Sequence, residues 1–577
     1  MKRLNFLQSF RGFDGLFSYL ERLSSGDRFL FWLTTIVLVV SIFWSGFVIN
    51  KQVSVLLPIE GGTLREGIIG TPRFVNPVLA ITRADLDLSN LIYSGIMRRT
   101  TTGDLVEDLA DSVTVSSDGK VYSVALRKDV YFHDGQPVTA YDVVYTIELI
   151  KDSGLKSPNR GNWNTVKVEL ISDYEINFIL DEAYFPFMEN LTQGILPKHF
   201  WEPLLVDEIP FSQLNTEPVG SGPYMVTDTK RSSDGLISSY NLTAFTDSIY
   251  NPKIKDIRTK FYASDEELLS ALQTGDIDST GALSVSALDK VNLDEFNVIQ
   301  YPLPRTFGLF LNHNKSAILR DQSIREALNV AIDKQDLVDK ILSGYAKPTD
   351  SPIPSDFFAL ESVSKETSDS GAEEAKRLLR QGGWTQSEAG NWVKDDDDKE
   401  QVLSLTITTA NSTLFTEVAD YISEVWRNLG IQVEVAKFEQ SDLIQSVIRT
   451  RDYELLLFGT DVGRSLDLYP FWHSSQREDP GLNVALYTHI DADAYLENFR
   501  TEPDPSIRSA TLQKLNGTIV SETPAIFLFN PTFVYVTNKE IGVFAVERIS
   551  KPSDRFDTIP QWHISEASVW PLFTNKK

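Results

Sequence analysis

The stretch LSLTITTANSTLFTEVADYISEVWRNLGIQVEV, residues 403–435, carries the pattern that decides the fold. It predicts a strand over Leu403 to Thr408, an amphipathic helix over Leu414 to Leu429 and a second strand over Ile431 to Val435. Gly430 supplies the stop at the C-terminal end of the helix. A strand, a helix and a strand in this order form a βαβ unit. The sequence therefore indicates an α/β fold.

A further apolar run follows this unit and ends beside candidate ligand-binding residues. Glu454 to Phe458 predicts a strand covered on both faces, because its apolar residues are continuous. Gly459, Thr460 and Asp461 come directly after it. In open α/β sheets, ligands bind beyond the carboxyl ends of the strands, so these three residues are candidates for ligand contact. The alternative is that Asp461 only caps a loop.

The N-terminal half shows a second set of strands and helices. Leu64 to Ile69 and Val121 to Leu126 are strand-like, with turn signals between the strands of a predicted meander. Thr139 to Asp142 resembles a capping box that opens an apolar helix. A separate mixed α/β lobe is therefore expected ahead of residue 303.

Length and composition agree with more than one hydrophobic core. The chain has 577 residues, 42% of them hydrophobic, which exceeds what a single core usually holds. The formal charge of −26 opposes binding to a phosphate backbone, so nucleic acid is not an expected partner. Because there is no Cys, disulfides, thiol nucleophiles and a lipid-bearing Cys are all excluded.

The N-terminus predicts a membrane anchor. Phe29 to Ile49 carries no charge and would span roughly 31 Å as a helix, which is close to the hydrocarbon thickness of a bilayer. No small-residue cleavage site follows, so the segment is interpreted as an uncleaved signal anchor. Five basic residues precede it and only Lys51 follows closely, which places the N-terminus in the cytoplasm. Residues 1–28 are interpreted as a cytoplasmic amphipathic segment, the alternative being a frayed tail.

Motifs for common chemistries do not occur in the sequence. There is no GxSxG elbow, HExxH helix, GxGxxG loop or GxxxxGK[ST] loop. The six His residues are dispersed, and Asp395 to Asp398 lack the spaced ligands of a calcium loop, so no metal site is expected. The sequence indicates no catalytic residue and no cofactor, which favours a binding protein over an enzyme.

Several ordered motifs closely resemble the family 5 extracellular solute-binding proteins, the group of oligopeptide, dipeptide and nickel binders of ABC importers. The resemblance covers residues 61–544. Its motifs are GGTLREGIIGTPRFVNP (61–77), the block from Leu91 to Glu148 that contains FHDGQPVTAYDVVYTIE, VGSGPYMV (219–226), FGLFLNHN (307–314) and REALNVAIDKQDLVDKIL (325–342).

The resemblance implies a two-lobed periplasmic-binding-protein-like fold that encloses its ligand by hinge closure, preceded by the one transmembrane helix. The expected organisation is an anchor over 29–49, a linker over 50–60, a first lobe over 61–302 with an extra subdomain at about 96–212, a second lobe over 303–524, and a return to the first lobe over 525–577.

In peptide-binding relatives, an acidic residue in the loop after a second-lobe strand pairs with the peptide's α-ammonium. FGTDVGRSLDLYPFW, residues 458–472, resembles that loop, with Asp461 at the acidic position and Asp467 as the alternative. Phe74, Tyr469 and Trp472 are candidate pocket walls, core packing being the alternative for each. The chain departs from the family in lacking the lipoprotein Cys, which the anchor replaces.

The predicted function is therefore an extracytoplasmic solute-binding protein of an ABC importer, monomeric, membrane-anchored and most simply a binder of short peptides. Its expected partners are the ligand, the permease subunits and the membrane. A sensory ectodomain is one alternative, and the same scaffold binding a sugar, an opine or a metal chelate is another. An enzyme on this scaffold would need a nucleophile or metal constellation that the sequence does not show.

Overall fold

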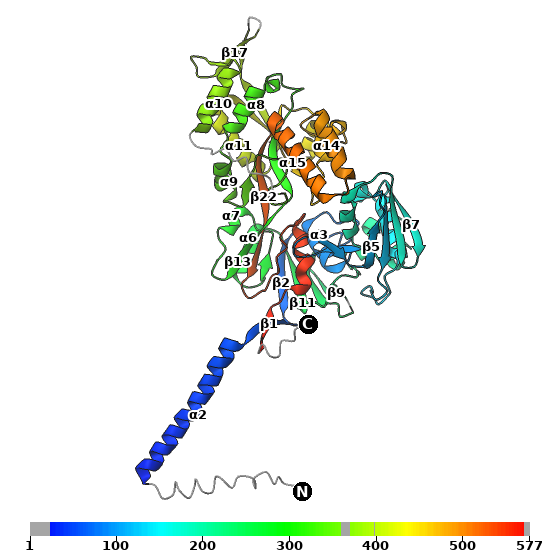
Figure 1. Ribbon diagram of the computed structural model, residues 1–577, viewed down its shortest axis with the longest axis vertical. Coiled ribbons are helices and arrows are strands. Elements are labelled where there is room, and N and C mark those ends of the chain that lie inside the picture. The colour runs from blue at the N-terminus through cyan, green and yellow to red at the C-terminus, as the bar shows by residue number, and fades with distance from the viewer. Residues whose placement is uncertain (1–23, 248, 359–369, 397–398, 570–577) are drawn as a thin grey trace. The chain divides into compact units, whose positions relative to one another are not determined.

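The computed structural model describes residues 24–247, 249–358, 370–396 and 399–569. The chain divides into two units, the first formed by residues 1–59 with 565–577 and the second by residues 60–564 (Figure 1).

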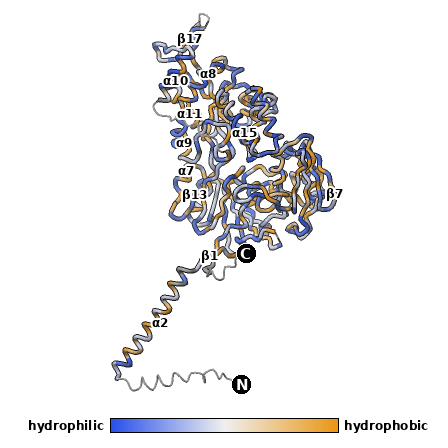
Figure 2. The backbone as a smooth tube through the Cα atoms, in the orientation of Figure 1, coloured by the Kyte–Doolittle hydropathy of each residue, from blue (hydrophilic) through white to orange (hydrophobic). Residues whose placement is uncertain are grey.

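The first unit holds one long apolar helix and a two-stranded sheet. The helix α2 (Ser25–Val53) begins at Ser24, whose hydroxyl accepts from the backbone N–H of Asp27 at 3.3 Å. Its stretch Ser25–Val48 is long and apolar enough to cross a membrane. Figure 2 draws several turns of this helix in the orange of hydrophobic residues. Strands β1 (Val55–Ile59) and β23 (Ser565–Val569) then pair antiparallel, so part of the expected 50–60 linker is a strand. Of the amphipathic segment expected over 1–28, residues 1–23 lie outside the described residues.

The second unit is organised around a long mixed sheet that runs through both lobes. Its order is β20-β19-β21-β14-β22-β12-β2-β11-β10-β9, with β13 and β15 also paired to β22. The first-lobe strands are β2 (Thr63–Ile69), β9 (Tyr224–Arg231), β10 (Ile237–Ala244), β11 (Asp256–Tyr262), β12 (Ser279–Thr280) and β13 (Phe296–Pro302). The second-lobe strands are β14 (Arg305–Leu311), β15 (Ala346–Pro348), β19 (Ser404–Ala410), β20 (Gln432–Phe438) and β21 (Leu455–Asp461).

The 14-residue strand β22 (Ala525–Asn538) belongs to both lobes. Its first half pairs with β14, and its second half pairs with β12 and β13. The chain therefore crosses between the lobes inside this strand as well as between β13 and β14.

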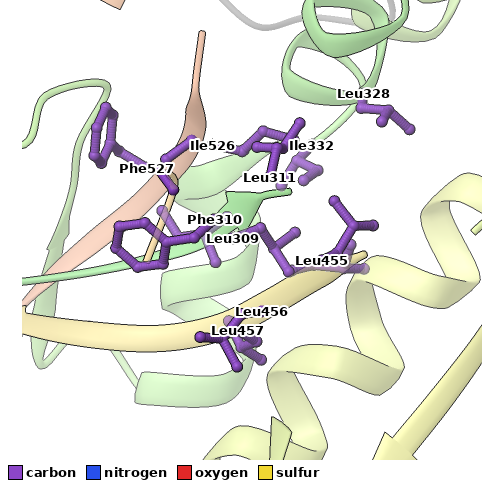
Figure 3. Close-up of a cluster of buried hydrophobic side chains, with 14 of the residues drawn as sticks. Leu309, Phe310, Leu311, Leu328, Ile332, Leu455, Leu456, Leu457, Ile526 and Phe527 are labelled. Carbon is purple, nitrogen blue, oxygen red and sulfur yellow. The ribbon is translucent and has the colours of Figure 1, made fainter. Parts of the chain in front are cut away.

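Two main hydrophobic cores match this division. One gathers buried residues from Leu64 to Leu303 and from Phe533 to Trp562. The other gathers buried residues from Leu309 to Phe529, and Figure 3 shows its centre, where Leu309 to Leu311 of β14 pack beside Leu455 to Leu457 of β21. The first-lobe helices are α3 (Arg83–Ile92), α6 (Asp265–Gln273) and α7 (Val285–Leu288). The second-lobe helices are α8 (Gln322–Val330), α9 (Lys334–Leu342), α10 (Ser370–Gln381), α11 (Thr413–Asn428), α12 (Gln440–Asp442), α13 (Tyr469–Trp472), α14 (Ile490–Thr501) and α15 (Pro505–Glu522).

The βαβ unit predicted from residues 403–435 is confirmed. β19 and β20 are parallel, with Leu405 opposite Val433, and α11 connects them. The helix buries Val418, Ile422 and Trp426, the face that its 3.6-residue period predicts. β21 joins β19 in parallel but β14 antiparallel, so the sheet is mixed at this point.

The subdomain is a four-stranded antiparallel sheet with one helix against it, and the predicted capping box opens that helix. Thr139 donates its backbone N–H to Asp142 Oδ2 at 2.9 Å at the start of α4. The elements are β5 (Ala110–Val115), β6 (Val121–Leu126), α4 (Ala140–Lys151), β7 (Val166–Ser172) and β8 (Glu175–Leu180), in the sheet order β5-β6-β8-β7.

Close packing explains the two glycines of the VGSGPYMV motif. A Cβ on Gly220 would lie 2.0 Å from the carbonyl oxygen of Ile92, and one on Gly222 would lie 2.6 Å from the carbonyl carbon of the same residue. Gly222 donates its backbone N–H to that Ile92 oxygen at 2.7 Å. The chain ahead of β9 therefore packs backbone against backbone on the end of α3, which only glycine permits.

A buried ion cluster ties the end of the chain to its beginning. Arg555 lies in helix η8 (Pro552–Gln561) and donates to Glu66 of β2 at 2.8 Å and to Asp87 of α3 at 2.7 Å. The three side chains are at most 1% exposed. Burial alone lowers the pKa of Arg555, but the charges of Asp87 and Glu66 outweigh it and raise that pKa.

We expect Arg555→Gln to lower the free energy of unfolding by about 3–5 kcal/mol, because it leaves two buried carboxylates without their cation. Denaturant unfolding followed by circular dichroism measures the change. Arg258→Gln, at an exposed position of β11, is the matched control and should stay within about 0.5 kcal/mol of wild type. Equal effects of the two substitutions would contradict this role of the cluster.

Candidate functional site

A cavity of about 620 Å³ opens between the lobes of the second unit. Its volume is within the range of about 300–1,000 Å³ that is typical of small-molecule sites. Three separate parts of the chain line it. The lining includes Tyr93, Arg98, Arg99, Asp108, Tyr184, Glu189 and Tyr250 from the first lobe, Asp461, Arg464, Asp467, Phe471 and Leu482 from the second, and Lys551, Asp554, Phe556 and Asp557 from the C-terminal return.

Asp461 lines this cavity at the end of β21 and already has a cationic neighbour. Its Oδ2 accepts from Nε of Arg305 on the adjacent strand at 2.8 Å, and its Oδ1 accepts from the backbone N–H of Gly463 at 3.1 Å. The side chain is 44% exposed, so its remaining lone pairs face solvent or a ligand. The carboxylate can therefore accept a further donor.

Asp467 also lines the cavity but is buried and held on several sides. Its Oδ2 accepts from Nη2 of Arg500 at 2.8 Å and from the hydroxyl of Tyr184 at 3.1 Å. The backbone N–H of Tyr469 donates to Oδ1 at 3.2 Å. Because Tyr184 belongs to the first lobe, this carboxylate joins the two lobes directly.

The other predicted site residues lie elsewhere in the second unit. Thr460 is buried within β21 and Gly459 lies against the ring of Phe307. Neither is among the residues that line the cavity.

The three candidate pocket walls also lie outside the cavity lining. Phe74 is partly buried against the first core. Tyr469 stacks on His473 and lies under the guanidinium of Arg500, whose Cζ is 3.8 Å from its ring centroid. Trp472 is 1% exposed and packs in the second core. Its neighbours Pro470 and Phe471 line the cavity instead.

The first-lobe wall contains a buried carboxyl that sequence reasoning did not identify. Asp108 accepts from the hydroxyl of Tyr250 at 2.6 Å, and that hydroxyl also lies 2.7 Å from Oγ of Ser94. Burial raises the pKa of Asp108 to about 7, although Tyr250 and the charge of Arg98 act against this rise. These residues are up to 156 positions apart in the chain, and no local motif marks them.

The C-terminal return contributes a second pair of carboxyls. Asp557 is partly buried and accepts from the side-chain amide of Asn90 at 3.0 Å, while Asp554 accepts from the backbone N–H groups of Ser550 and Lys551. Burial and the nearby charge of Asp554 raise the pKa of Asp557. Within the described part of the chain, no group of three or more His, Cys, Asp or Glu side chains is arranged to hold a metal ion.

Two α/β lobes joined by repeated crossings, with a polar cavity between them, define a ligand-binding protein of the periplasmic type. The chain belongs to the bacterial extracellular solute-binding proteins of family 5, whose sequence pattern it matches over residues 104–480. It is an extracytoplasmic solute-binding protein for an ABC importer, and its relatives are binding proteins, not enzymes.

Individual relatives agree with this assignment. The oligopeptide-binding protein AppA of Bacillus subtilis (strain 168) is 26% identical, over 82% of this chain and 87% of its own. The nickel-binding periplasmic protein of Escherichia coli (strain K12) is 26% identical, over 69% of this chain and 75% of its own. The crystal structure of the ABC transporter substrate-binding protein CtaP from Listeria monocytogenes aligns with a TM-score of 0.72 at 25% identity, covering 87% of this chain and 99% of that one.

We expect the buried Asp108 to make stability depend on pH. The pKa of an aspartate in an unfolded chain is about 3.9. Because the folded-state pKa is raised to about 7, the folded protein holds the proton more tightly, so this contribution is complete below pH 4 and is lost as the pH rises to 7.

Asp108→Asn should remove that part of the pH dependence. Between pH 5 and pH 8, the variant should therefore lose less free energy of unfolding than the wild type does, by about 1 kcal/mol or more. Denaturant unfolding of wild type and variant at pH 5 and pH 8 measures it. Asp111→Asn, on the exposed part of β5, is the control. If the free energy of unfolding changes between pH 5 and pH 8 by the same amount in Asp108→Asn as in the wild type, the assignment of this pH dependence to Asp108 is contradicted.

Proposed function

We propose that this protein captures short peptides between its two lobes and delivers them to its importer from a membrane tether. The observation that supports it most is the cavity itself, whose walls come from both lobes and whose second-lobe rim is the loop after β21. The printed name of the relative AppA, an oligopeptide-binding protein, supports the ligand class.

We also propose Asp461, and not Asp467, as the partner of the peptide's α-ammonium. Asp467 is 8% exposed and is saturated by Arg500, Tyr184 and a backbone N–H. Asp461 is much more exposed and keeps free lone pairs beside its single ion pair with Arg305. A ligand ammonium would share this carboxylate with Arg305, forming a second charge-assisted hydrogen bond.

Asp461→Asn preserves the shape of the side chain and removes its charge. We expect it to weaken the binding of a free tripeptide at least about tenfold, since such a bond is typically worth about 1.5–3 kcal/mol. N-acetylation of the peptide should weaken its binding to the wild type comparably. Isothermal titration calorimetry of both pairs measures the losses.

Asp420→Asn, an exposed carboxylate on α11 outside the cavity lining, serves as the control for lost negative charge. If Asp461→Asn and the acetylated peptide both bind as tightly as their parents, the ammonium assignment fails. If no peptide binds at all, the peptide class fails and a chelate or another small solute replaces it.

The membrane tether is the second part of the proposal. The helix α2 carries exposed apolar side chains along its length and has no acidic or basic residue between Arg28 and Lys51. Five basic residues at or before position 28 favour a cytoplasmic N-terminus. β1 follows immediately and pairs with the C-terminal strand β23, so the ectodomain begins with folded chain.

A chain that begins at Ser54 keeps β1 and lacks α2. We expect it to remain in solution without detergent and to unfold cooperatively, because the apolar helix contributes nothing to a water-exposed fold. Size-exclusion chromatography and thermal unfolding measure both properties. Aggregation of this chain in buffer, with cooperative unfolding only in detergent, would contradict the tether.

A further inference from the structure

Two neighbouring aromatic side chains of the first-lobe subdomain contact the second lobe. Tyr184 and Phe185 follow β8 and lie at the start of helix η2 (Phe185–Thr192). The hydroxyl of Tyr184 donates to Oδ2 of Asp467 at 3.1 Å, and Cζ of Arg508 on α15 lies 5.6 Å from the ring centroid of Phe185. These residues belong to neither of the segments in which the chain crosses between the lobes. The lobes are therefore joined at a second place, apart from the crossings.

The second-lobe side of this contact is held in one orientation. Asp467 is 8% exposed and accepts from Nε of Arg500 at 3.0 Å and from Nη2 at 2.8 Å. The same guanidinium packs on the ring of Tyr469, with its Cζ 3.8 Å from the ring centroid. Two hydrogen bonds and a ring contact fix the plane of the guanidinium. The carboxylate that meets Tyr184 is therefore a preorganised acceptor.

The first-lobe side is also fixed by its own lobe. Tyr122 of β6 is buried, and its hydroxyl donates to the backbone oxygen of Tyr184 at 3.1 Å. Burial and then the charge of Asp467 raise the pKa of Tyr184, so its hydroxyl keeps the proton that it donates. Cζ of Arg500 lies 5.5 Å from the centroid of the Tyr184 ring. The second lobe thus offers an anion to the hydroxyl and a cation to the ring.

Opening of the cleft has to break this contact. A hydrogen bond to an ionised group contributes more than a neutral one, even when water replaces the lost partner. The loop that contains Asp467 makes one further bond to the first lobe, from Nη1 of Arg464 to the backbone oxygen of Gly103 at 3.2 Å. Every donor and acceptor in these bonds belongs to the protein. A bound solute is therefore not the only source of free energy for closure.

We propose that Tyr184, Asp467 and Arg500 form a latch that holds the two lobes together without a bound solute. The empty protein is then mainly closed and opens transiently to admit its solute. The latch sets the ratio of closed to open molecules, and it acts in the same way for a peptide and for any other solute. It therefore stands or falls separately from the peptide assignment.

The test measures the distance between the lobes in the full chain in detergent. Because the chain has no Cys, Thr165→Cys in the subdomain and Gln513→Cys on α15 supply the only two labelling sites, and both positions are exposed. Spin labels at the two sites report the distribution of distances by double electron–electron resonance. Extended dialysis removes bound solute beforehand, and mass spectrometry of the protein verifies the removal.

We expect the labelled protein with an intact latch to show mainly the shorter of two distances. Tyr184→Phe keeps the ring and removes only the hydroxyl. It should lower the ratio of closed to open molecules about tenfold, which is the size of effect typical of a hydrogen bond to a charged group. The control is Tyr174→Phe, which removes a hydroxyl between β7 and β8 of the same subdomain and should leave the ratio unchanged.

Two results would overturn the latch. One is an intact protein that is mainly at the longer distance without solute. The other is a Tyr184→Phe variant whose ratio of closed to open molecules equals that of the intact protein. Neither measurement uses a peptide, so either result leaves the proposed function standing.

A double-mutant cycle tests whether Tyr184 acts through Asp467. Asp467→Asn weakens the acceptor, so Tyr184→Phe should change the ratio of closed to open molecules less in the Asp467→Asn background than in the intact protein. Such a difference is expected only for groups that interact with each other. If the two single effects multiply in the double variant, the hydroxyl acts by another route and the latch is overturned.

Discussion

The buried cluster of Arg555, Glu66 and Asp87 is the interaction on which the rest of the molecule depends. A buried guanidinium must be paired, and its partners are contributed by β2 and α3, 489 and 468 residues earlier in the chain. The cluster therefore holds the helix η8 against β2 and α3, the first strand and the first helix of the second unit. Tyr535 of β22 also donates to Glu66 at 2.8 Å, which brings the crossing strand into the same network.

The cavity wall follows from this attachment. Asp554 and Asp557 flank Arg555 on η8, so fixing Arg555 also places these two carboxyls in the lining. The loop after β21 also contributes to the lining, with Asp461 exposed and Arg464 partly buried. The lining of the cavity thus contains side chains of both signs of charge.

The two crossings between the lobes are joined to each other. The side-chain amide of Asn530 in β22 donates to the backbone oxygen of Arg305 and to the hydroxyl of Thr306, both at 2.9 Å. Leu303 donates its backbone N–H to the oxygen of Pro531 at 3.3 Å. These bonds tie the two crossing segments together. Arg305 belongs to this region and to the ion pair with Asp461, so the proposed ligand contact lies next to the crossings.

The sequence by itself determined the fold class, the βαβ unit of residues 403–435, the capping box at Thr139 and the apolar N-terminal helix. These features depend on local periodicity and on caps a few residues apart, which a sequence displays directly. The ordered sequence motifs extended the prediction from the fold class to the protein family. The sequence predicted that this strand ends at Phe458, whereas β21 continues to Asp461, so Gly459 and Thr460 belong to the strand and not to the loop after it.

Only the tertiary structure decided which side chains face the cavity. Trp472 and Phe471 are adjacent, yet the first packs in the core and the second lines the cavity, because alternate positions of a short helix point in different directions. Asp108 and Tyr250 meet across 142 residues. Burial and pairing are properties of contacts between distant segments, so no local pattern records them.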